Sequence, residues 1–248
     1  MAVSWYDAEL IGQKVEATGI NRFWFQIKSD VPLSYDPGQF FTLDLPIGEK
    51  RIDRWRSYTI ANQFDGSNIV EFIISYKKNG LASEYFFNEI NKGDTVKLKG
   101  PEGTFVLPKA KDQRIVMLAA GTGIAPFRAM LQELSSQGHS YPSIDLYFGT
   151  KTEKTILYLE ELEDWAHFVE RLTIHVCFSR ESKIPKTKSK LNYHLGYIHP
   201  VYLSQQKAAS KNTQYLICGW SAMIDESVAH LMNTMKVSRE QIRYELFG

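Results

Sequence analysis

The feature that most constrains this fold is an apolar run that leads directly into a glycine-rich turn. Residues 115–120 read Ile-Val-Met-Leu-Ala-Ala and are followed at once by Gly121-Thr122-Gly123-Ile124-Ala125-Pro126. An apolar run of this length fits a strand that is buried on both faces, and proline is favoured in the first turn of a helix. A strand, a glycine turn and a helix in this order present backbone amides to a phosphate group. The sequence therefore predicts a nucleotide-binding βα unit.

Before this unit the pattern is that of short strands separated by turns. The turn signals are Tyr-Asp-Pro-Gly at 35–38, Asp-Gly-Ser-Asn at 65–68 and Asn-Lys-Gly-Asp at 91–94. This pattern is typical of an antiparallel barrel. We expect strands at 23–27, 40–45, 55–60, 69–76 and 95–98, and one short helix over 83–90 with Ser83 as its N-cap.

After Pro108 the pattern changes to buried strands that alternate with helices, which indicates βαβ units around a parallel sheet. Strands are expected at 114–120, 144–149, 172–178, 215–218 and 242–246, and helices are expected to start near residues 125, 154, 200 and 222. The sequence thus predicts two domains, an antiparallel β-barrel over residues 1–108 and an α/β domain with a parallel sheet over residues 109–248.

Composition excludes several classes of protein. The formal net charge of +1 gives no overall field for nucleic acid. The two cysteines, Cys177 and Cys218, are fewer than the four thiolates of a usual iron–sulfur cluster. There is no signal-peptide pattern and no apolar run of about 18 residues, so we expect a cytoplasmic protein without a membrane insertion. The histidines show no spacing typical of metal ligands, so no metal is expected.

A second motif lies in the first half of the chain. In the run Arg56-Ser57-Tyr58-Thr59, the period-two alternation of a strand points Arg56 and Tyr58 to one face. This face would offer a cation to a phosphate group and a ring to a planar heterocycle. A turn and helix start follow at Gly80-Leu81-Ala82-Ser83, where helix-end amides and the serine hydroxyl suit the same phosphates.

These motifs resemble those of the ferredoxin-NADP reductase family, in which an Arg-x-Tyr-Ser/Thr run binds FAD and a Gly-Thr-Gly-x-Ala-Pro loop binds the nicotinamide dinucleotide. The resemblance spans nearly the whole chain, because further pieces follow in the family's order: Gly100-Pro101-Glu102-Gly103-Thr104-Phe105, Ser179-Arg180, Cys218-Gly219 and a terminal aromatic residue. It implies that Arg56 binds the FAD diphosphate, that Tyr58 covers one flavin face and that Thr59 lies near the reactive ring nitrogen.

The same resemblance assigns residues to the nicotinamide nucleotide. Ser179 and Arg180 would bind the ribose phosphate that distinguishes NADP from NAD, and a guanidinium suits that phosphate. Lys151 and Tyr197 would add contacts to the adenylate. Cys218, with Gly219, would shape the pocket for hydride transfer without acting as a nucleophile.

The last residues complete the implied site. Phe247 would cover the flavin face that the nicotinamide approaches, and Glu245 would serve proton supply. The family's plant-type enzymes end on tyrosine, whereas this chain has Phe247 followed by Gly248.

The resemblance implies an enzyme that transfers a hydride from NADPH to FAD and single electrons to a separate carrier, ferredoxin or flavodoxin. Two alternatives stay open. The first is an NAD(P)H-dependent reductase component of an oxygenase or another redox system. The second is a non-catalytic flavoprotein subunit that senses or relays redox state.

Overall fold

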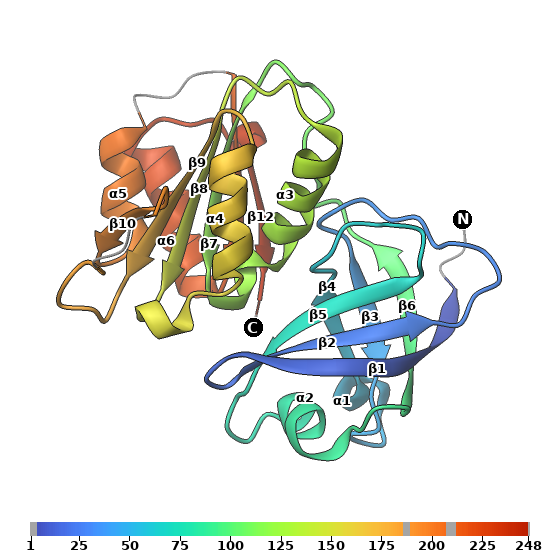
Figure 1. Cartoon of the computed structure of the whole chain (residues 1–248). Helices are drawn as coiled ribbons and strands as arrows, with labels where there is room; N and C mark the ends of the chain where they lie inside the picture. The colour runs from blue at the N-terminus through green and yellow to red at the C-terminus, as the bar shows by residue number, and fades with distance from the viewer. Residues whose placement is uncertain (1–3, 186–188, 207–211, 248) are drawn as a thin grey trace.

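The structure, a computed structural model, describes residues 4–185, 189–206 and 212–247. Two six-stranded sheets form two bodies that lie side by side, and the C-terminal strand ends near the boundary between them (Figure 1). The connection between the sheets runs from Glu102 to Arg114. The boundary that we predicted at residue 108 falls within this connection.

The first sheet is antiparallel throughout, and its strands lie in the order β4-β3-β6-β1-β2-β5. The strands are β1 (Trp5–Ala17), β2 (Ile20–Ile27), β3 (Phe40–Asp44), β4 (Trp55–Thr59), β5 (Ile69–Ser75) and β6 (Thr95–Glu102). Alternate residues point inward, as Phe23, Phe25 and Ile27 do on β2. Just beyond β4, the amide of Ala61 donates to the carbonyl of Glu71 on β5 at 2.8 Å. This bond links the two ends of the sheet order, and the predicted antiparallel barrel is confirmed.

The helical segments of this domain are α1 (Arg51–Arg54) and α2 (Leu81–Glu84), which continues as η1 (Tyr85–Glu89). The prediction that Ser83 caps this helix was wrong. The helix begins at Leu81, and Gly80 is its N-cap residue. Ser83 lies inside the first turn, where its hydroxyl is 2.9 Å from the carbonyl oxygens of Lys77 and Gly80. The hydroxyl thus holds the preceding turn, and the helix starts two residues earlier than we expected.

The second sheet is parallel, and its strands lie in the order β10-β9-β8-β7-β11-β12. The strands are β7 (Arg114–Ala120), β8 (Ile144–Thr150), β9 (Leu172–Phe178), β10 (Asn192–Leu195), β11 (Thr213–Gly219) and β12 (Ile242–Leu246). The chain adds strands on one side of β7 up to β10 and then continues on the other side with β11. Ligands of such sheets bind at the carboxyl ends of the strands beside this reversal. The predicted parallel sheet is confirmed, with β10 as an additional strand.

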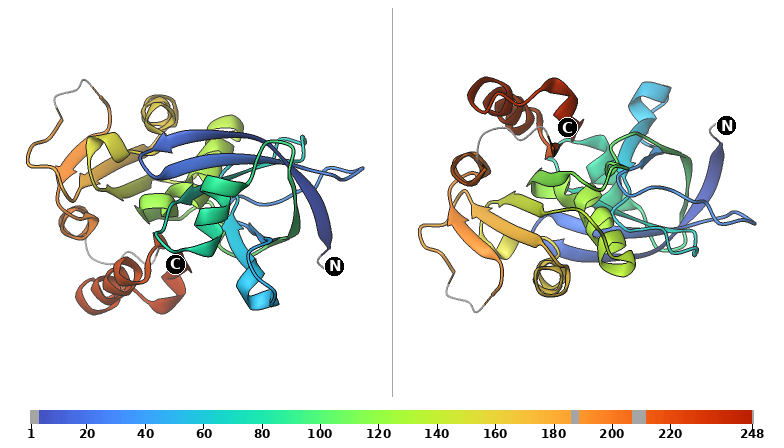
Figure 2. Two further views of the ribbon diagram at one scale, coloured as in Figure 1. Left: turned by 90° about the horizontal axis from the view of Figure 1, so that it is seen from below. Right: turned by 90° about the horizontal axis from the view of Figure 1, so that it is seen from above.

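Helices cover both faces of the second sheet, α3 and α4 on one face and α5 and α6 on the other (Figure 2). The helical segments are η2 (Gly121–Ile124), α3 (Ala125–Gln137), η3 (Glu153–Thr155), α4 (Leu159–Phe168), α5 (Ile198–Gln205), α6 (Ser221–Ala229), η4 (His230–Thr234) and η5 (Arg239–Gln241). The starts that we predicted near residues 125, 200 and 222 lie within two residues of those observed. The start predicted near residue 154 was wrong, because Thr152 and Thr155 close the short turn η3 and α4 begins only at Leu159.

A buried carboxylate joins the two domains. Glu71 on β5 is 2% exposed, and its oxygens accept hydrogen bonds from Arg22 at 2.7 and 2.9 Å and from Trp24 at 3.0 Å. From the second domain, Arg128 on α3 donates at 3.1 Å and the Tyr158 hydroxyl donates at 3.0 Å. We call these five residues the Glu71 network. It fixes the barrel against the helical layer formed by α3 and α4.

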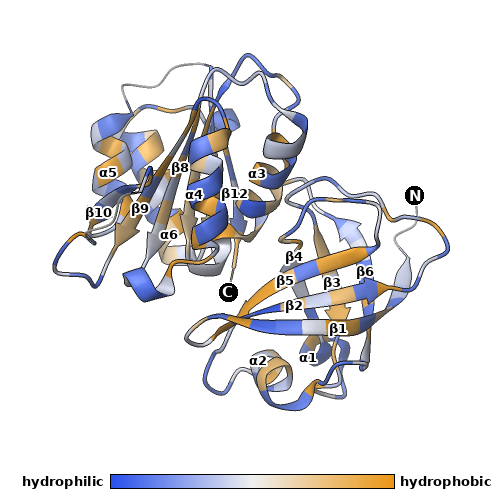
Figure 3. Cartoon of the chain, in the orientation of Figure 1, coloured by the Kyte–Doolittle hydropathy of each residue, from blue (hydrophilic) through white to orange (hydrophobic). Residues whose placement is uncertain are grey.

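Apolar residues are concentrated along the strands of both sheets, and polar residues along the outer faces of the helices and in the loops (Figure 3). Buried side chains form one core inside the barrel and one on each face of the parallel sheet. Within the described part of the chain, every helix is too short or too polar to cross a membrane.

Candidate active site

Strand β4 carries the predicted flavin residues at one end of the barrel sheet. The Arg56 guanidinium donates through Nη1 to the carbonyl oxygens of Ile52 and Trp55, at 3.1 and 2.8 Å. It makes no further hydrogen bond or ion pair within residues 4–185, 189–206 and 212–247, so its remaining N–H groups are available to an anion. The Ser57 hydroxyl lies 3.1 Å from the hydroxyl of Thr42 on β3 and is exposed.

Tyr58 presents a half-buried ring beside Arg56. Its ring centroid lies 5.5 Å from that of Phe86 and 6.1 Å from that of Phe72, and both contacts are tilted or edge-on. Burial raises the pKa of the Tyr58 hydroxyl, while the charge of Arg56 lowers it. The charge of Arg56 thus reaches the Tyr58 hydroxyl, and the joint binding of a flavin by the two side chains stays a prediction.

The turn before α2 offers backbone donors rather than the predicted hydroxyl. The Ser83 hydroxyl is occupied by the Lys77–Gly80 turn, and Ser83 and Ala82 are buried. Because the first N–H groups of a helix lack intrahelical partners, the amides of Leu81 and Ala82 remain as donors. Leu81 is 54% exposed, which leaves this turn accessible to a ligand.

The loop after β7 requires both of its glycines. A Cβ atom on Gly123 would lie 2.3 Å from the carbonyl oxygen of Cys218, so only glycine lets η2 approach β11 this closely. Gly121 has a positive φ of 55°, and nothing lies within 4 Å of its missing Cβ. Pro126 occupies the first turn of α3, as predicted. Thr122 and Ile124 lie in the 3₁₀ turn η2, and Ala125 is the first residue of α3.

Cys218 and Gly219 end β11 directly beside this loop. The β11 strand is paired with β7, so the two motifs lie at neighbouring carboxyl ends where the strand order reverses. Cys218 is fully buried, and burial together with the charge of Glu245 raises the pKa of its thiol well above the ordinary value. A neutral, buried thiol shapes a pocket and is a poor nucleophile.

Glu245 connects this edge to the flavin strand. It is the register partner of Cys218 across β11 and β12, and its carboxylate accepts a hydrogen bond from the Thr59 hydroxyl at the end of β4. Burial raises the pKa of Glu245, while the bond from Thr59 lowers it. A residue of the flavin motif and a residue of the C-terminal strand therefore touch across the domain boundary.

Phe247 continues past β12 beside the same strands. Its amide donates to the carbonyl of Gly219 at 2.8 Å, and its partly buried side chain packs against the core that contains Cys218. This places the aromatic residue at the edge that carries Cys218 and Glu245. Gly248 lies outside the described residues.

The residues assigned to the adenylate gather at the ends of β8 and β9. The amides of Ser179 and Arg180 donate to the carbonyls of Thr150 and Lys151, each at 2.9 Å. The Ser179 hydroxyl also lies 3.2 Å from the Thr150 carbonyl. The side chains of Arg180 and Lys151 are exposed, and Tyr197, before α5, is 69% exposed.

Sequence reasoning missed the contacts that hold the two halves of the site together. Arg128 follows the loop on α3 and donates to the carbonyl of Ala61 at 2.7 Å, two residues beyond Thr59. Because these residues are 67 positions apart, no local pattern reveals their contact. The bond between Thr59 and Glu245, which are 186 positions apart, was missed for the same reason.

The same two-part organisation is found in known protein families. Residues 7–107 match the oxidoreductase FAD-binding domain, and residues 117–229 match the oxidoreductase NAD-binding domain. The chain belongs to the ferredoxin reductase-like family of flavin- and nicotinamide-dependent oxidoreductases. The resemblance drawn from the sequence motifs is thereby confirmed, as is the expectation of an oxidoreductase with FAD and a nicotinamide nucleotide.

Individual relatives differ in the systems that they serve. The electron transfer component of anthranilate 1,2-dioxygenase from Acinetobacter baylyi is 30% identical over 193 residues, which cover 78% of this chain and 52% of that protein. Ferredoxin-NADP reductase B of Sorangium cellulosum is 24% identical, with 98% of this chain and 97% of that protein covered. The structure of a cytochrome P450 reductase from Amycolatopsis superposes with a TM-score of 0.84 at 22% identity, covering 99% of this chain and 70% of that one. The chain spans about half to three-fifths of the curated relatives first matched.

The residues present fit the FAD of this family. Arg56 has guanidinium N–H groups that no described residue uses, and Tyr58 offers a ring whose other contacts are with Phe72 and Phe86. Bound FAD would supply hydride and electron chemistry. The protein's own residues hold Glu245 at the domain boundary through the hydrogen bond from Thr59.

Proposed function

We propose that this protein is a ferredoxin-NADP reductase, which transfers a hydride from NADPH to FAD and passes single electrons to a separate ferredoxin or flavodoxin. In this proposal Arg56 and the turn at Gly80 bind the FAD diphosphate, and Tyr58 covers one flavin face. The loop from Gly121 to Pro126 binds the pyrophosphate of NADPH. Cys218 bounds the nicotinamide pocket.

The observation that carries the proposal is the contact between Thr59 and Glu245. The first residue belongs to the flavin motif, and the second is paired with Cys218 at the nucleotide edge. Hydride transfer needs the two rings in contact, with reacting atoms about 3–3.5 Å apart. A direct hydrogen bond between the two motifs supports a single site that serves both rings. Glu245 is the group through which a proton would reach it.

The choice of NADPH depends on Arg180. This residue follows β9 at the carboxyl edge, and its guanidinium forms no hydrogen bond or ion pair with any described residue. A free guanidinium suits a ribose phosphate, which it can bind through two parallel hydrogen bonds. Ser179 precedes Arg180 in the chain. Lys151, which follows β8, and Tyr197, which precedes α5, are both exposed. These four residues form the proposed adenylate site.

The test is a coupled assay with a purified carrier. The FAD-loaded protein receives NADPH without oxygen, and the reduction of added ferredoxin or flavodoxin is followed by the carrier's own absorbance. The proposal predicts carrier reduction that requires both NADPH and the protein. Rapid reduction of an artificial dye without reduction of either carrier would contradict the assigned acceptor.

A second candidate is a reductase component of an oxygenase, with NADH or NADPH as donor. The match to the anthranilate dioxygenase component, at 30% identity, favours it. Both functions need the same flavin and nucleotide sites, so they differ in the acceptor and in the use made of Arg180. A preference for NADH together with failure to reduce ferredoxin or flavodoxin would select this candidate.

A further inference from the structure

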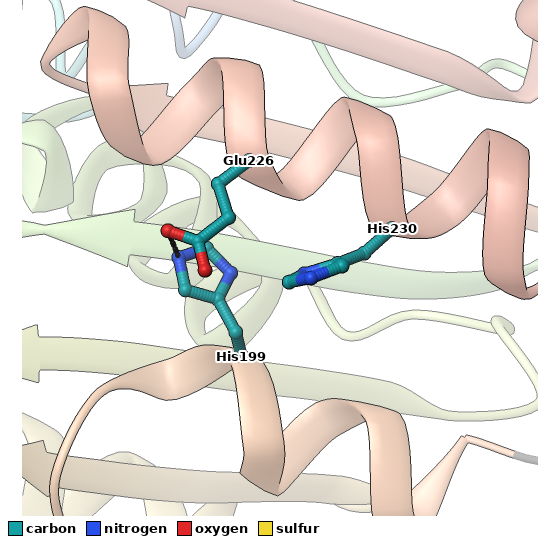
Figure 4. A group of neighbouring side chains, drawn as sticks. All are labelled: His199, Glu226 and His230. Atoms are coloured by element: carbon teal, nitrogen blue, oxygen red, sulfur yellow. Dashed lines mark ion pairs between the residues drawn. The ribbon is translucent and has the colours of Figure 1, made fainter.

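Three potential metal ligands lie close together between α5 and α6, the helices that cover one face of the parallel sheet. His199 lies in the first turn of α5, while Glu226 on α6 and His230 at the start of η4 are one helical turn apart (Figure 4). One ligand atom from each residue lies within 4.8 Å of the others, and His199 Nε2 is 3.3 Å from Glu226 Oε2. None of the three belongs to the flavin or nucleotide site.

The three side chains of the cluster differ in their exposure to solvent. His199 is 6% exposed, His230 is partly buried, and the side chain of Glu226 is 57% exposed. The exposed carboxylate of Glu226 gives an ion a path to the buried imidazole of His199.

One tyrosine hydroxyl lies within hydrogen-bond distance of both imidazole rings. The Tyr202 hydroxyl lies 3.3 Å from Nδ1 of His199 and 3.3 Å from Nδ1 of His230. Metal-bound histidines usually place their second ring nitrogen on such an oxygen, which fixes the orientation of the ring. With Nδ1 held by Tyr202, Nε2 of His199 remains directed at Glu226. A simple surface ion pair does not require this buried support.

We propose that His199, Glu226 and His230 bind a zinc ion that joins α5 to α6. Two imidazoles and one carboxylate are a ligand set that zinc accepts, with a fourth position left for water. Zinc bonds of about 2.0–2.2 Å bring ligand atoms to roughly 3.4 Å from one another. The exposed Glu226 side chain is free to rotate inward, which shortens the separation of up to 4.8 Å observed here. No metal was expected from the sequence, because His199 lies on a different helix from Glu226 and His230.

Zinc titration of the FAD-loaded, chelator-treated full chain tests this site. Calorimetry should give one zinc ion per chain, and zinc at about 100 times its Kd should raise the thermal midpoint by about 5 °C. Cobalt(II) should give the intense visible bands of a four-coordinate site, at longer wavelengths than the flavin. The variants Glu226→Gln and His230→Gln each remove one ligand, the first at an exposed and the second at a partly buried position. Each should weaken zinc binding at least tenfold.

Two further variants separate a built site from general affinity for zinc. His167→Gln removes an exposed histidine of the same domain and should bind zinc like the parent. Tyr202→Phe keeps all three ligands and should weaken binding about tenfold. NADPH-driven dye reduction should persist in every variant, so this test is independent of the proposed reductase activity. Zinc binding by His230→Gln with the parent's affinity and stoichiometry would overturn the site, as would no binding by the parent.

Discussion

In the proposed reaction, Glu245 is the residue whose surroundings matter most. The Thr59 hydroxyl donates to it from the barrel, and Cys218 faces it across the parallel sheet. Burial raises its pKa, and the bond from Thr59 lowers the pKa by less. The carboxylate is therefore held at the boundary of two domains, and its pKa lies above the ordinary value for a glutamate.

The variant Glu245→Gln tests this environment through the dependence of stability on pH. The folded-state pKa of Glu245 lies above the ordinary value of 4.5, so the folded protein binds more protons between these two values and its stability falls as pH rises through them. Glutamine does not titrate, so the variant lacks this loss of stability at higher pH. Its amide oxygen can still accept the hydrogen bond from Thr59. We expect Glu245→Gln to raise the thermal midpoint at pH 8 by more than at pH 4.5. An equal change at both pH values would contradict the raised pKa.

Gly123 is predicted to be irreplaceable for a packing reason. In Gly123→Ala the new Cβ would lie 2.3 Å from the Cys218 carbonyl, and backbone atoms there cannot easily move aside. We expect a loss of about 1–3 kcal/mol of stability and weaker binding of NADPH, measured by denaturant unfolding and by titration.

The matched control for this substitution is Gly12→Ala in the barrel. Its Cβ would meet only the Trp24 ring at 3.7 Å, an ordinary contact. It should change stability little. Equal stability of Gly123→Ala and the parent would show that η2 can move away from β11 at no cost.

At the scale of elements, the ends of β8 and β9 determine where Arg180 lies. Backbone bonds from Ser179 and Arg180 to Thr150 and Lys151 extend the pairing beyond the strands. The Arg180 guanidinium is thereby held at the carboxyl edge without a partner among the described residues. The ends of β8 and β9 therefore determine where Arg180 lies, and its guanidinium supplies the positive charge.

Arg180→Gln should change the choice of donor. A hydrogen bond to a charged group contributes about 1.5–3 kcal/mol, so we expect kcat/KM for NADPH to fall by roughly tenfold to 150-fold while that for NADH stays within about twofold. Steady-state dye reduction with both nucleotides measures this. Lys154→Gln, the loss of a nearby exposed cation on η3, should leave the ratio unchanged. Equal losses with both donors would remove Arg180 from the proposed phosphate site.

Elements were predictable where the sequence carries a strong local pattern. The apolar run at 115–120 and Pro126 identify β7 and the start of α3, because periodicity and proline geometry act within a few residues. The start of α2 was not predictable, since the Ser83 hydroxyl can cap a helix or hold the preceding turn and the local sequence does not distinguish these. The late start of α4 depends on the bonds between Thr152 and Thr155 in η3.

At the scale of the whole molecule, the Glu71 network is a buried polar contact that joins the two domains. Its partners Arg22, Arg128 and Tyr158 are 49, 57 and 87 positions from Glu71. Such separations carry no local signal, which explains why the two domains were predictable from the sequence and their junction was not. The same holds for the active site, whose motifs were found singly while their meeting at Thr59 and Glu245 depends on this junction.

Arg128→Met should loosen the junction. It removes one of two arginines that neutralise a carboxylate with 2% exposure, and breaking a buried pair in this way costs about 3 kcal/mol. The free energy of unfolding, measured through flavin fluorescence, should fall by that amount. The rate of flavin reduction by NADPH should also fall. The control Arg54→Met breaks an ion pair with Asp44 in which Arg54 is 38% exposed, so its cost should stay below about 1 kcal/mol. Equal effects of the two variants would contradict a structural role for the network.

The central claim is that one site at the domain boundary brings a nicotinamide to a flavin. Its most direct test is an anaerobic titration of the FAD-loaded protein, with NADPH or NADH added in steps while the visible flavin bands are recorded. We expect bleaching by one equivalent of NADPH, at concentrations at which NADH has little effect. A flavin that neither nucleotide bleaches would contradict a shared site for the two rings and would favour a non-catalytic flavoprotein subunit.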